Sequence, residues 1–133
     1  MRKKELSVER IKIKTQLAPA SVGPYSQAVL VGDTLYCSGQ IPIDPKTGHM
    51  ITSGIETETA RVLENLEGVL TGAGMSMNNV VSCRVYMVDI NDYAQINEIY
   101  ARYFGSNAPA RETVEVSALP RGARVEIACI AVR

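Results

Sequence analysis

Arg111 and Glu126 are the two residues of this sequence whose types and surroundings best suit chemistry. Arg111 follows the stiff segment 108–110 (APA) and opens a strand-like run, where a guanidinium can hold a carboxylate through two parallel hydrogen bonds. Glu126 lies in an otherwise apolar run, so its carboxylate must be paired, have a raised pKa or line a site. The residue types alone leave simpler alternatives open. In these alternatives Arg111 is a surface or ion-paired arginine, and Glu126 is a structural ion-pair partner of Arg124 or Arg121.

Few other residues fit a known catalytic or metal-binding pattern. The three cysteines, Cys37, Cys83 and Cys129, form no CxxC pair, and His49 is the only histidine, so the sequence predicts no metal site. It contains no P-loop, dinucleotide fingerprint, nucleophile elbow or HExxH motif. We expect His49, beside a turn-like segment, to be exposed to solvent. Tyr25 stands in a Gly-Pro loop and is either a pocket wall or a core residue.

Composition is typical of a single globular domain. Of the 133 residues, 46% are hydrophobic and 21% are charged, which favours a packed core over disorder. Fourteen basic and fourteen acidic side chains balance, which disfavours a dedicated nucleic-acid binder. Residues 1–14 carry six basic and two acidic side chains, and we interpret them as a basic N-terminal extension and first strand. No stretch approaches the ~18 apolar residues of a membrane span, and unpaired thiols fit a reducing, cytoplasmic setting.

Hydrophobic patterning predicts the elements that must position these residues. Helical spacing of apolar residues predicts one helix near 62–73, ended by glycines, and a second near 91–104. Alternation predicts strands near 11–13, 26–31, 34–38, 80–88, 112–116 and 124–132. Gly32-Asp33 is a hairpin signal between two of them. The expected fold class is therefore α+β, with a single sheet of roughly six strands and two helices on one face.

The last strand carries apolar residues on both of its sides. Val125, Ile127 and Cys129 point one way, and Ala128 and Ile130 point the other way. A strand with this pattern is buried on both faces. Because two helices can cover only one face, we expect another subunit on the other face.

If residues 111–117 and 124–132 pair as a hairpin around a turn at 120–121, Arg111 lies opposite Ile130. Ile130 is four residues from Glu126, so the Cα atoms of Arg111 and Glu126 are then roughly 14 Å apart along the strands. A three-carbon substrate is too small to bridge this gap. We therefore predict that the two side chains reach a shared substrate from different subunits, a hypothesis that fails if the strands are not neighbours.

Five motifs in a fixed order carry a family resemblance. They are GPYSQAV (23–29), SGQIP (38–42), DINDYAQIN (89–97), PARETVEV (109–116) and RVEIACIAVR (124–133). Together they closely resemble the Rid family, the reactive-intermediate deaminases or YjgF-like proteins, in the RidA subgroup. The resemblance runs from about Ala18 to Arg133. We therefore interpret residues 1–133 as a single Rid-family domain with an unusually basic start.

The resemblance implies a chorismate-mutase-like fold, a homotrimer with active sites between subunits, and no cofactor. It implies hydrolysis of carboxylate-bearing imines and enamines, such as 2-iminobutanoate and 2-iminopropanoate, to 2-oxo acids and ammonia. Arg111 matches the arginine that binds the substrate carboxylate, and Glu126 matches the acidic residue that positions water. The other matched pocket positions are Tyr25, Ser38, Gly39 and Asn97, together with Thr113, where many members have cysteine.

Two other functions stay open at the level of sequence. One is an RNA-binding or RNA-cleaving translation inhibitor, as older labels of the family suggest; balanced charge and a single histidine disfavour it. The other is a non-catalytic trimer that binds 2-oxo acids. The presence of Glu126 beside Arg111 favours an enzyme, because a carboxylate-binding module needs only the arginine.

Overall fold

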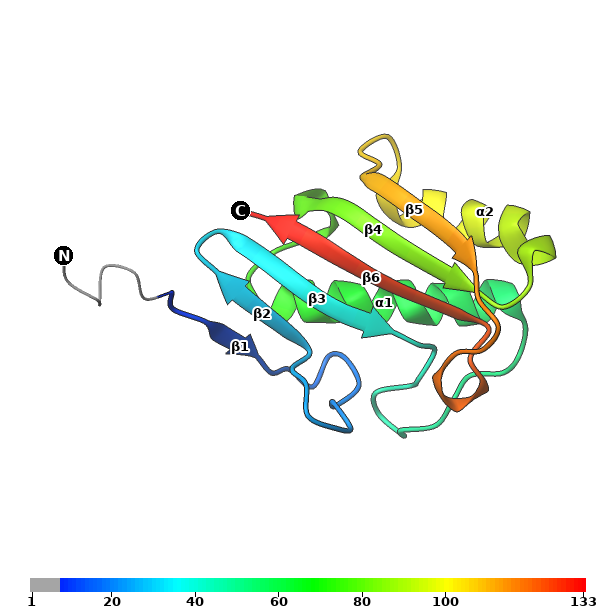
Figure 1. Cartoon of the computed structure of the whole chain (residues 1–133), viewed down its shortest axis with the longest axis horizontal. Helices are drawn as coiled ribbons and strands as arrows, with labels where there is room; N and C mark the ends of the chain where they lie inside the picture. Colours follow the sequence, from blue (N-terminus) through cyan, green and yellow to red (C-terminus); the bar gives the residue numbers. More distant parts are fainter. Residues whose placement is uncertain (1–7) are drawn as a thin grey trace.

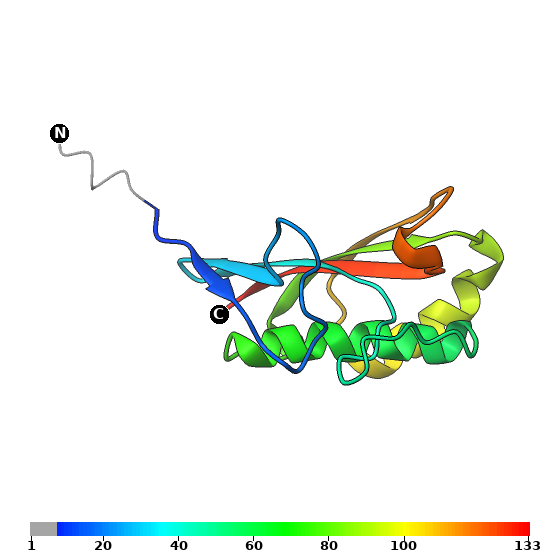
Figure 2. The same ribbon diagram turned by 90° about the horizontal axis from the view of Figure 1, so that it is seen from below.

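Six strands form one mixed sheet, and both α-helices of the described chain lie on one face of it (Figures 1 and 2). This computed structural model describes residues 8–133, so residues 1–7 of the predicted basic extension lie outside the described residues. The strands are β1 (Ile11–Ile13), β2 (Ala28–Val31), β3 (Thr34–Gln40), β4 (Val80–Met87), β5 (Ala110–Glu115) and β6 (Val125–Val132), and the helices are α1 (Ile55–Gly72) and α2 (Tyr93–Phe104). The predicted fold class is confirmed.

The strand order is β1-β2-β3-β6-β4-β5. All neighbouring pairs are antiparallel except β4 and β5, which are parallel because α2 carries the chain back between them. The predicted hairpin at Gly32 joins β2 to β3, and Gly32 adopts the positive φ of 60° that such a turn requires. None of the helices in the described part of the chain is long and apolar enough to cross a membrane.

The assumed pairing of residues 111–117 with 124–132 is wrong, so the argument from it for a site shared between subunits fails. Strand β4 lies between β5 and β6 and pairs with both. The two-sided apolar pattern of β6 explains this order, because such a strand is most stable at the centre of the sheet between β3 and β4. The side chains of β5 are exposed or half-buried, and that strand takes the edge.

The core fills the space between the sheet and α1. Val62, Leu63, Leu66, Val69 and Leu70 of α1 are at most 1% exposed. They form the apolar stripe that the sequence predicts. The opposite face of the sheet, called the helix-free face below, has no α-helix over it in the described residues and carries only the short 3-10 turn Pro120–Gly122 (Figure 2).

The three cysteines form a row across the sheet. Cys129 of β6 lies opposite Cys37 of β3 on one side and opposite Cys83 of β4 on the other. All three are free thiols buried in the core. They act there as small apolar groups, as expected.

Candidate functional site

Arg111 and Glu126 point to opposite faces of the same sheet. Arg111 is in register with Cys83, which packs in the core beneath the helices. Glu126 is in register with Tyr86 on the other side of β4. Cys83 and Tyr86 are three residues apart, so their side chains point in opposite directions, and so do those of their partners. Arg111 and Glu126 are separated by two strand spacings across the sheet and by three residues along it. Their Cα atoms are therefore roughly 14 Å apart. One chain therefore offers two separate half-sites.

The first half-site is the Arg111 cluster, made of Arg111, Tyr93, Asn97, Tyr100 and Thr113. The guanidinium of Arg111 lies over the ring of Tyr100, 4.8 Å from its centroid, and 5.6 Å from the centroid of Tyr93. Its Nη2 atom donates a hydrogen bond of 3.1 Å to the Tyr93 hydroxyl. Both tyrosines come from α2, so this helix fixes the direction of the guanidinium. Four of its five N–H donors are free for a ligand such as a carboxylate, as far as the bonds among residues 8–133 show.

Three buried oxygens of the Arg111 cluster have no hydrogen-bond partner in the described chain. They are Asn97 Oδ1, Tyr100 Oη and Thr113 Oγ1. Unpaired buried polar atoms are uncommon, because each loses its hydration and gains nothing in return. Their gathering around one arginine marks a place for a polar ligand.

Burial and the arginine shape the acid–base properties of the cluster. Desolvation by burial, then a contact with Cys83, raises the pKa of the Tyr100 phenol, so this hydroxyl stays protonated. Tyr93 behaves in the opposite way. The Asn97 side chain as a donor, followed by the charge and hydrogen bond of Arg111, lowers the pKa of Tyr93.

The second half-site is the Glu126 pocket, a hollow of about 730 Å³ on the helix-free face. Two loops wall it, one that includes Tyr25 and one that includes Arg121. Ser38 and Gly39 line its floor, where β3 has an irregular register against β6. The Glu126 carboxylate lies directly over Gly39, where a Cβ atom would collide with Glu126 Oε2. Gly39 therefore makes room for the carboxylate.

Glu126 has no ion-pair partner among residues 8–133. Arg124, one of its two expected partners, instead binds Glu58 of α1, with Nη2 2.5 Å from Oε2. Arg121, the other, donates long hydrogen bonds of 3.4 Å to the carbonyl of Gly48. Desolvation by burial raises the pKa of Glu126, with no cation to oppose it. A carboxylate of this kind suits general-base chemistry.

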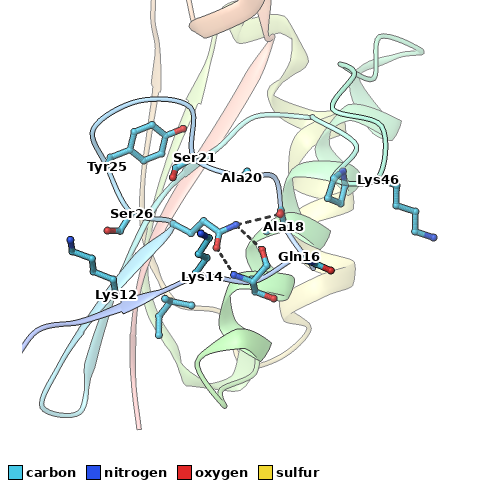
Figure 3. Close-up of a pocket in the computed structure, with 13 residues that line it drawn as sticks. Lys12, Lys14, Gln16, Ala18, Ala20, Ser21, Tyr25, Ser26 and Lys46 are labelled. Carbon is cyan, nitrogen blue, oxygen red and sulfur yellow. Dashed lines mark hydrogen bonds between the residues drawn. The ribbon is translucent and has the colours of Figure 1, made fainter.

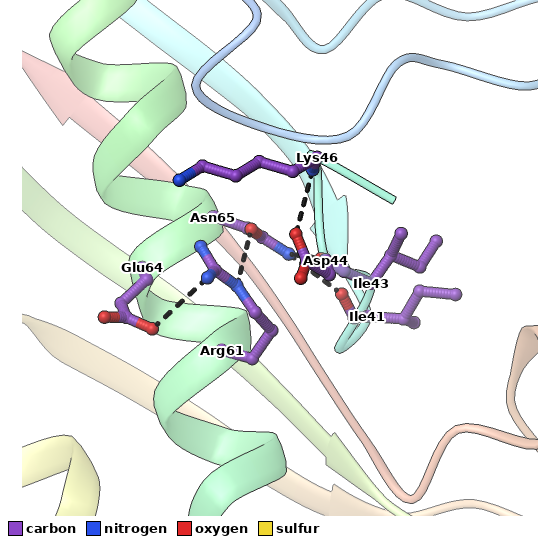
Figure 4. Close-up of polar contacts among 7 residues, drawn as sticks. All are labelled: Ile41, Ile43, Asp44, Lys46, Arg61, Glu64 and Asn65. Carbon is purple, nitrogen blue, oxygen red and sulfur yellow. Dashed lines mark hydrogen bonds and ion pairs between the residues drawn. The ribbon is translucent and has the colours of Figure 1, made fainter. Parts of the chain in front are cut away.

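Asn65 of α1 fixes one wall of the Glu126 pocket (Figure 4). This residue is fully buried, and its Nδ2 atom donates to the carbonyl oxygens of Ile41 and Ile43 at 3.2 and 2.9 Å. Its Oδ1 atom accepts a hydrogen bond of 3.1 Å from Arg61 Nε. Ile41 and Ile43 both line the pocket. Because the donor and the acceptor of this buried amide are both hydrogen-bonded, Asn65 holds the segment with Ile41 and Ile43 against α1.

A larger hollow, of about 1100 Å³, lies beside β1 and contains Tyr25 but none of the other predicted site residues (Figure 3). Its lysines do not converge: Lys12 and Lys46 point away from each other. The Gln27 side chain anchors the loop between β1 and β2, because its Nε2 atom donates to the carbonyls of Ala18 and Pro19. We infer that these hydrogen bonds set the shape of the hollow.

The structure divides the predicted site residues into two sets. Tyr25, Ser38, Gly39 and Glu126 share the Glu126 pocket, while Asn97, Arg111 and Thr113 belong to the Arg111 cluster. The backbone N–H of Ser38 donates to the Gln27 carbonyl at 3.0 Å, so it is not free to bind a ligand.

Sequence reasoning missed Tyr93, Tyr100 and Arg121. The spacing of Tyr93, Asn97 and Tyr100 on one helical face is a signal that could have found the first two. Arg121 is the only non-glycine residue in the described residues with a positive φ, 56°. That backbone conformation leaves no clear trace in the sequence. His49 is exposed, as expected. Among residues 8–133, no group of three or more His, Cys, Asp or Glu side chains could hold a metal ion.

Comparisons with known proteins identify a matching family and proteins of similar sequence and fold. The sequence profile of the endoribonuclease L-PSP family matches residues 15–133. A RutC family protein of Pyrococcus horikoshii is 50% identical over 119 residues, which cover 90% of this chain and 94% of the relative. The 2-iminobutanoate/2-iminopropanoate deaminase of Mus musculus is 48% identical over 127 residues, 96% of this chain and 94% of the relative. The crystal structure of Escherichia coli TdcF with bound serine superposes with a TM-score of 0.89 at 37% identity, over 92% of this chain and 98% of that one.

Proposed function

Because the chain belongs to the endoribonuclease L-PSP family, which comprises the Rid or YjgF-like proteins, we propose that it hydrolyses imines and enamines derived from amino acids. The substrates we propose are 2-iminobutanoate and 2-iminopropanoate, and the products are 2-oxo acids and ammonia. The name of the mouse relative supports this activity. The observation that carries the proposal is the Arg111 cluster, a half-buried guanidinium surrounded by buried oxygens without partners.

The proposed chemistry needs few groups, because the carbon of a protonated imine is already electrophilic. Arg111 holds the carboxylate of the substrate through parallel hydrogen bonds. Glu126 accepts a proton from water as the water oxygen attacks the imine carbon. The tetrahedral carbinolamine then loses ammonia, and the proton on Glu126 returns to the departing nitrogen. The overall reaction joins the iminium ion and water to give the 2-oxo acid and an ammonium ion.

We further propose that the Arg111 cluster of one subunit faces the Glu126 pocket of the next in a homotrimer. The two half-sites lie on opposite faces of one sheet, so a small substrate cannot touch both within a chain. The helix-free face also keeps large apolar side chains at its surface. Tyr36 is 51% exposed and Val132 is 38% exposed. An apolar face of this kind is suited to burial against another subunit.

The proposed assembly has a direct mass test. Light scattering in dilute buffer should give about three times the chain mass of 14.4 kDa, because a closed ring of three subunits covers every helix-free face. A folded monomer at micromolar concentration would contradict both the trimer and the shared site.

Replacing Gly39 with alanine should remove most of the activity without unfolding the protein. The new Cβ atom would collide with the end of the Glu126 side chain, which can rotate away at little cost. The displaced carboxylate would no longer hold water against the imine carbon, and misplacement of about 1 Å can cost about 10²-fold in rate. Imine clearance and thermal unfolding should be measured together. Clearance at the wild-type level in Gly39→Ala would contradict this role of Gly39.

The Glu126 carboxylate predicts the pH dependence of the reaction. Only its ionised form accepts a proton, so kcat/KM should rise with pH through the pKa of Glu126, which burial raises and the facing Arg111 of the proposed trimer lowers. Glu126→Gln should abolish this acid limb together with most of the turnover. A profile of kcat/KM against pH checks the prediction, and an acid limb that survives in the glutamine variant would contradict it.

The general test of the proposed function is imine clearance. An amino-acid oxidase generates 2-iminopropanoate from alanine, and semicarbazide traps what remains. Adding this protein should lower the trapped fraction. RNA cleavage is a second candidate because the matching family carries the name endoribonuclease. Cleavage of labelled RNA by the purified protein that is lost in Arg111→Ala, without any imine clearance, would favour that function.

A further inference from the structure

Tyr93 places a reactive hydroxyl directly beside the guanidinium of Arg111. It is the first residue of α2, and 40% of it is exposed, so a ligand at the Arg111 cluster can reach it. Its oxygen accepts the 3.1 Å hydrogen bond from Arg111 Nη2. Nothing in the hydrolysis described above uses this hydroxyl.

The hydrogen-bond capacity of a phenol limits what Tyr93 can do there. A tyrosine hydroxyl has two acceptor positions and one O–H donor. The Arg111 guanidinium occupies one acceptor position. The O–H group is left to donate, and no hydrogen bond from it to another residue is found among residues 8–133. The neighbouring Asn97 side chain and the Arg111 guanidinium also lower the pKa of Tyr93, which makes it a stronger acid than an ordinary phenol.

The enamine form of the proposed substrates needs an acid of this kind. An enamine such as 2-aminobut-2-enoate is not electrophilic at the carbon that bears nitrogen until a proton has been added to the neighbouring C3 carbon. In these small molecules C3 is only two bonds from the carboxylate carbon. A carboxylate held by Arg111 therefore brings C3 close to whatever lies beside the guanidinium.

We propose that Tyr93 is a catalytic acid that converts the enamine form of the substrate into the imine form within this site. The O–H bond of Tyr93 breaks, its proton bonds to C3, and the carbon–carbon double-bond electrons form that bond while the nitrogen lone pair forms the C=N bond. The product is the iminium ion that Glu126-bound water then attacks. Arg111 stabilises the phenolate, and solvent reprotonates the exposed hydroxyl. This inference rests on the proposed deaminase function.

Stereochemistry at C3 provides a test that a structural role would not affect. A threonine dehydratase generates 2-aminobut-2-enoate in D₂O, and lactate dehydrogenase with NADH reduces the 2-oxobutanoate at once, which preserves the label. We expect the wild-type protein to give C3-deuterated product with one configuration in excess over the dehydratase alone. Tyr93→Phe, which removes only the hydroxyl, should return this excess to the background.

Rates on two substrates complete the test. General acids contribute about 10²-fold or more, so the loss in Tyr93→Phe should be at least about 10-fold larger on the dehydratase-generated enamine than on the oxidase-generated imine. Tyr103→Phe, elsewhere on α2, is the matched control and should behave as wild type on both. An unchanged stereochemical excess in Tyr93→Phe, or no excess in wild type, would overturn the role of Tyr93. If the wild-type protein clears no imine at all, the deaminase function itself is wrong.

Discussion

Replacement of Arg111 by alanine should abolish imine clearance while the fold and the assembly persist. The guanidinium is the group that fixes the substrate carboxylate, and loss of correct positioning costs about 10³-fold or more when no other group replaces it. Arg111 is at the edge strand β5 and only half-buried, so its removal leaves the core unchanged. The measurements are semicarbazide-trapped imine for activity, and circular dichroism with light scattering for structure.

Two further variants make the Arg111 prediction specific. Arg111→Lys should restore only part of the activity, because an ammonium keeps the charge but lacks the planar pair of N–H donors. Arg102→Ala removes an arginine from the exposed side of α2, where it pairs with Glu98, and should leave activity at the wild-type level. Near-normal turnover by Arg111→Ala would show that Arg111 is structural and that the substrate binds elsewhere.

Mixed trimers should recover activity from two inactive variants. Arg111→Ala and Glu126→Ala chains, each inactive alone, would be co-expressed in equal amounts and assembled at random. If each site takes Arg111 from one chain and Glu126 from its neighbour, every mixed trimer has one intact site, and about a quarter of wild-type activity returns. The opposite directions of the two side chains in one sheet are the physical reason for this expectation.

The control for this experiment is the composition of the trimers. Native mass spectrometry should find mixed assemblies in about the proportions of random association, three quarters of the total. Mixed trimers without activity would rule out a site shared in this way. A mixture of Arg111→Ala with Gly39→Ala should behave like the first mixture, because Gly39 and Glu126 belong to the same half-site.

Local patterns of residues are enough to predict which helices and strands form and which faces they bury. The spacing of Val62, Leu66 and Leu70 predicts α1, and the alternation in β6 predicts a strand buried on both sides. These patterns are local: each residue's side of a helix or strand follows from its period. The types of Arg111 and Glu126 in their contexts also marked them as candidate functional residues before any fold was known.

Which strands are neighbours is seen only in the folded chain, and this order changes the site. A hairpin of β5 with β6 would have placed Arg111 and Glu126 on the same face. Insertion of β4 between the strands places them on opposite faces, with Arg111 against Tyr93 and Tyr100 of α2. Strand order depends on how several apolar faces are buried at once, so it is a property of the whole packed sheet. No local pattern in residues 110–132 predicts this strand order. For the same reason, the position of the Tyr93 hydroxyl beside Arg111 is known only from the folded chain.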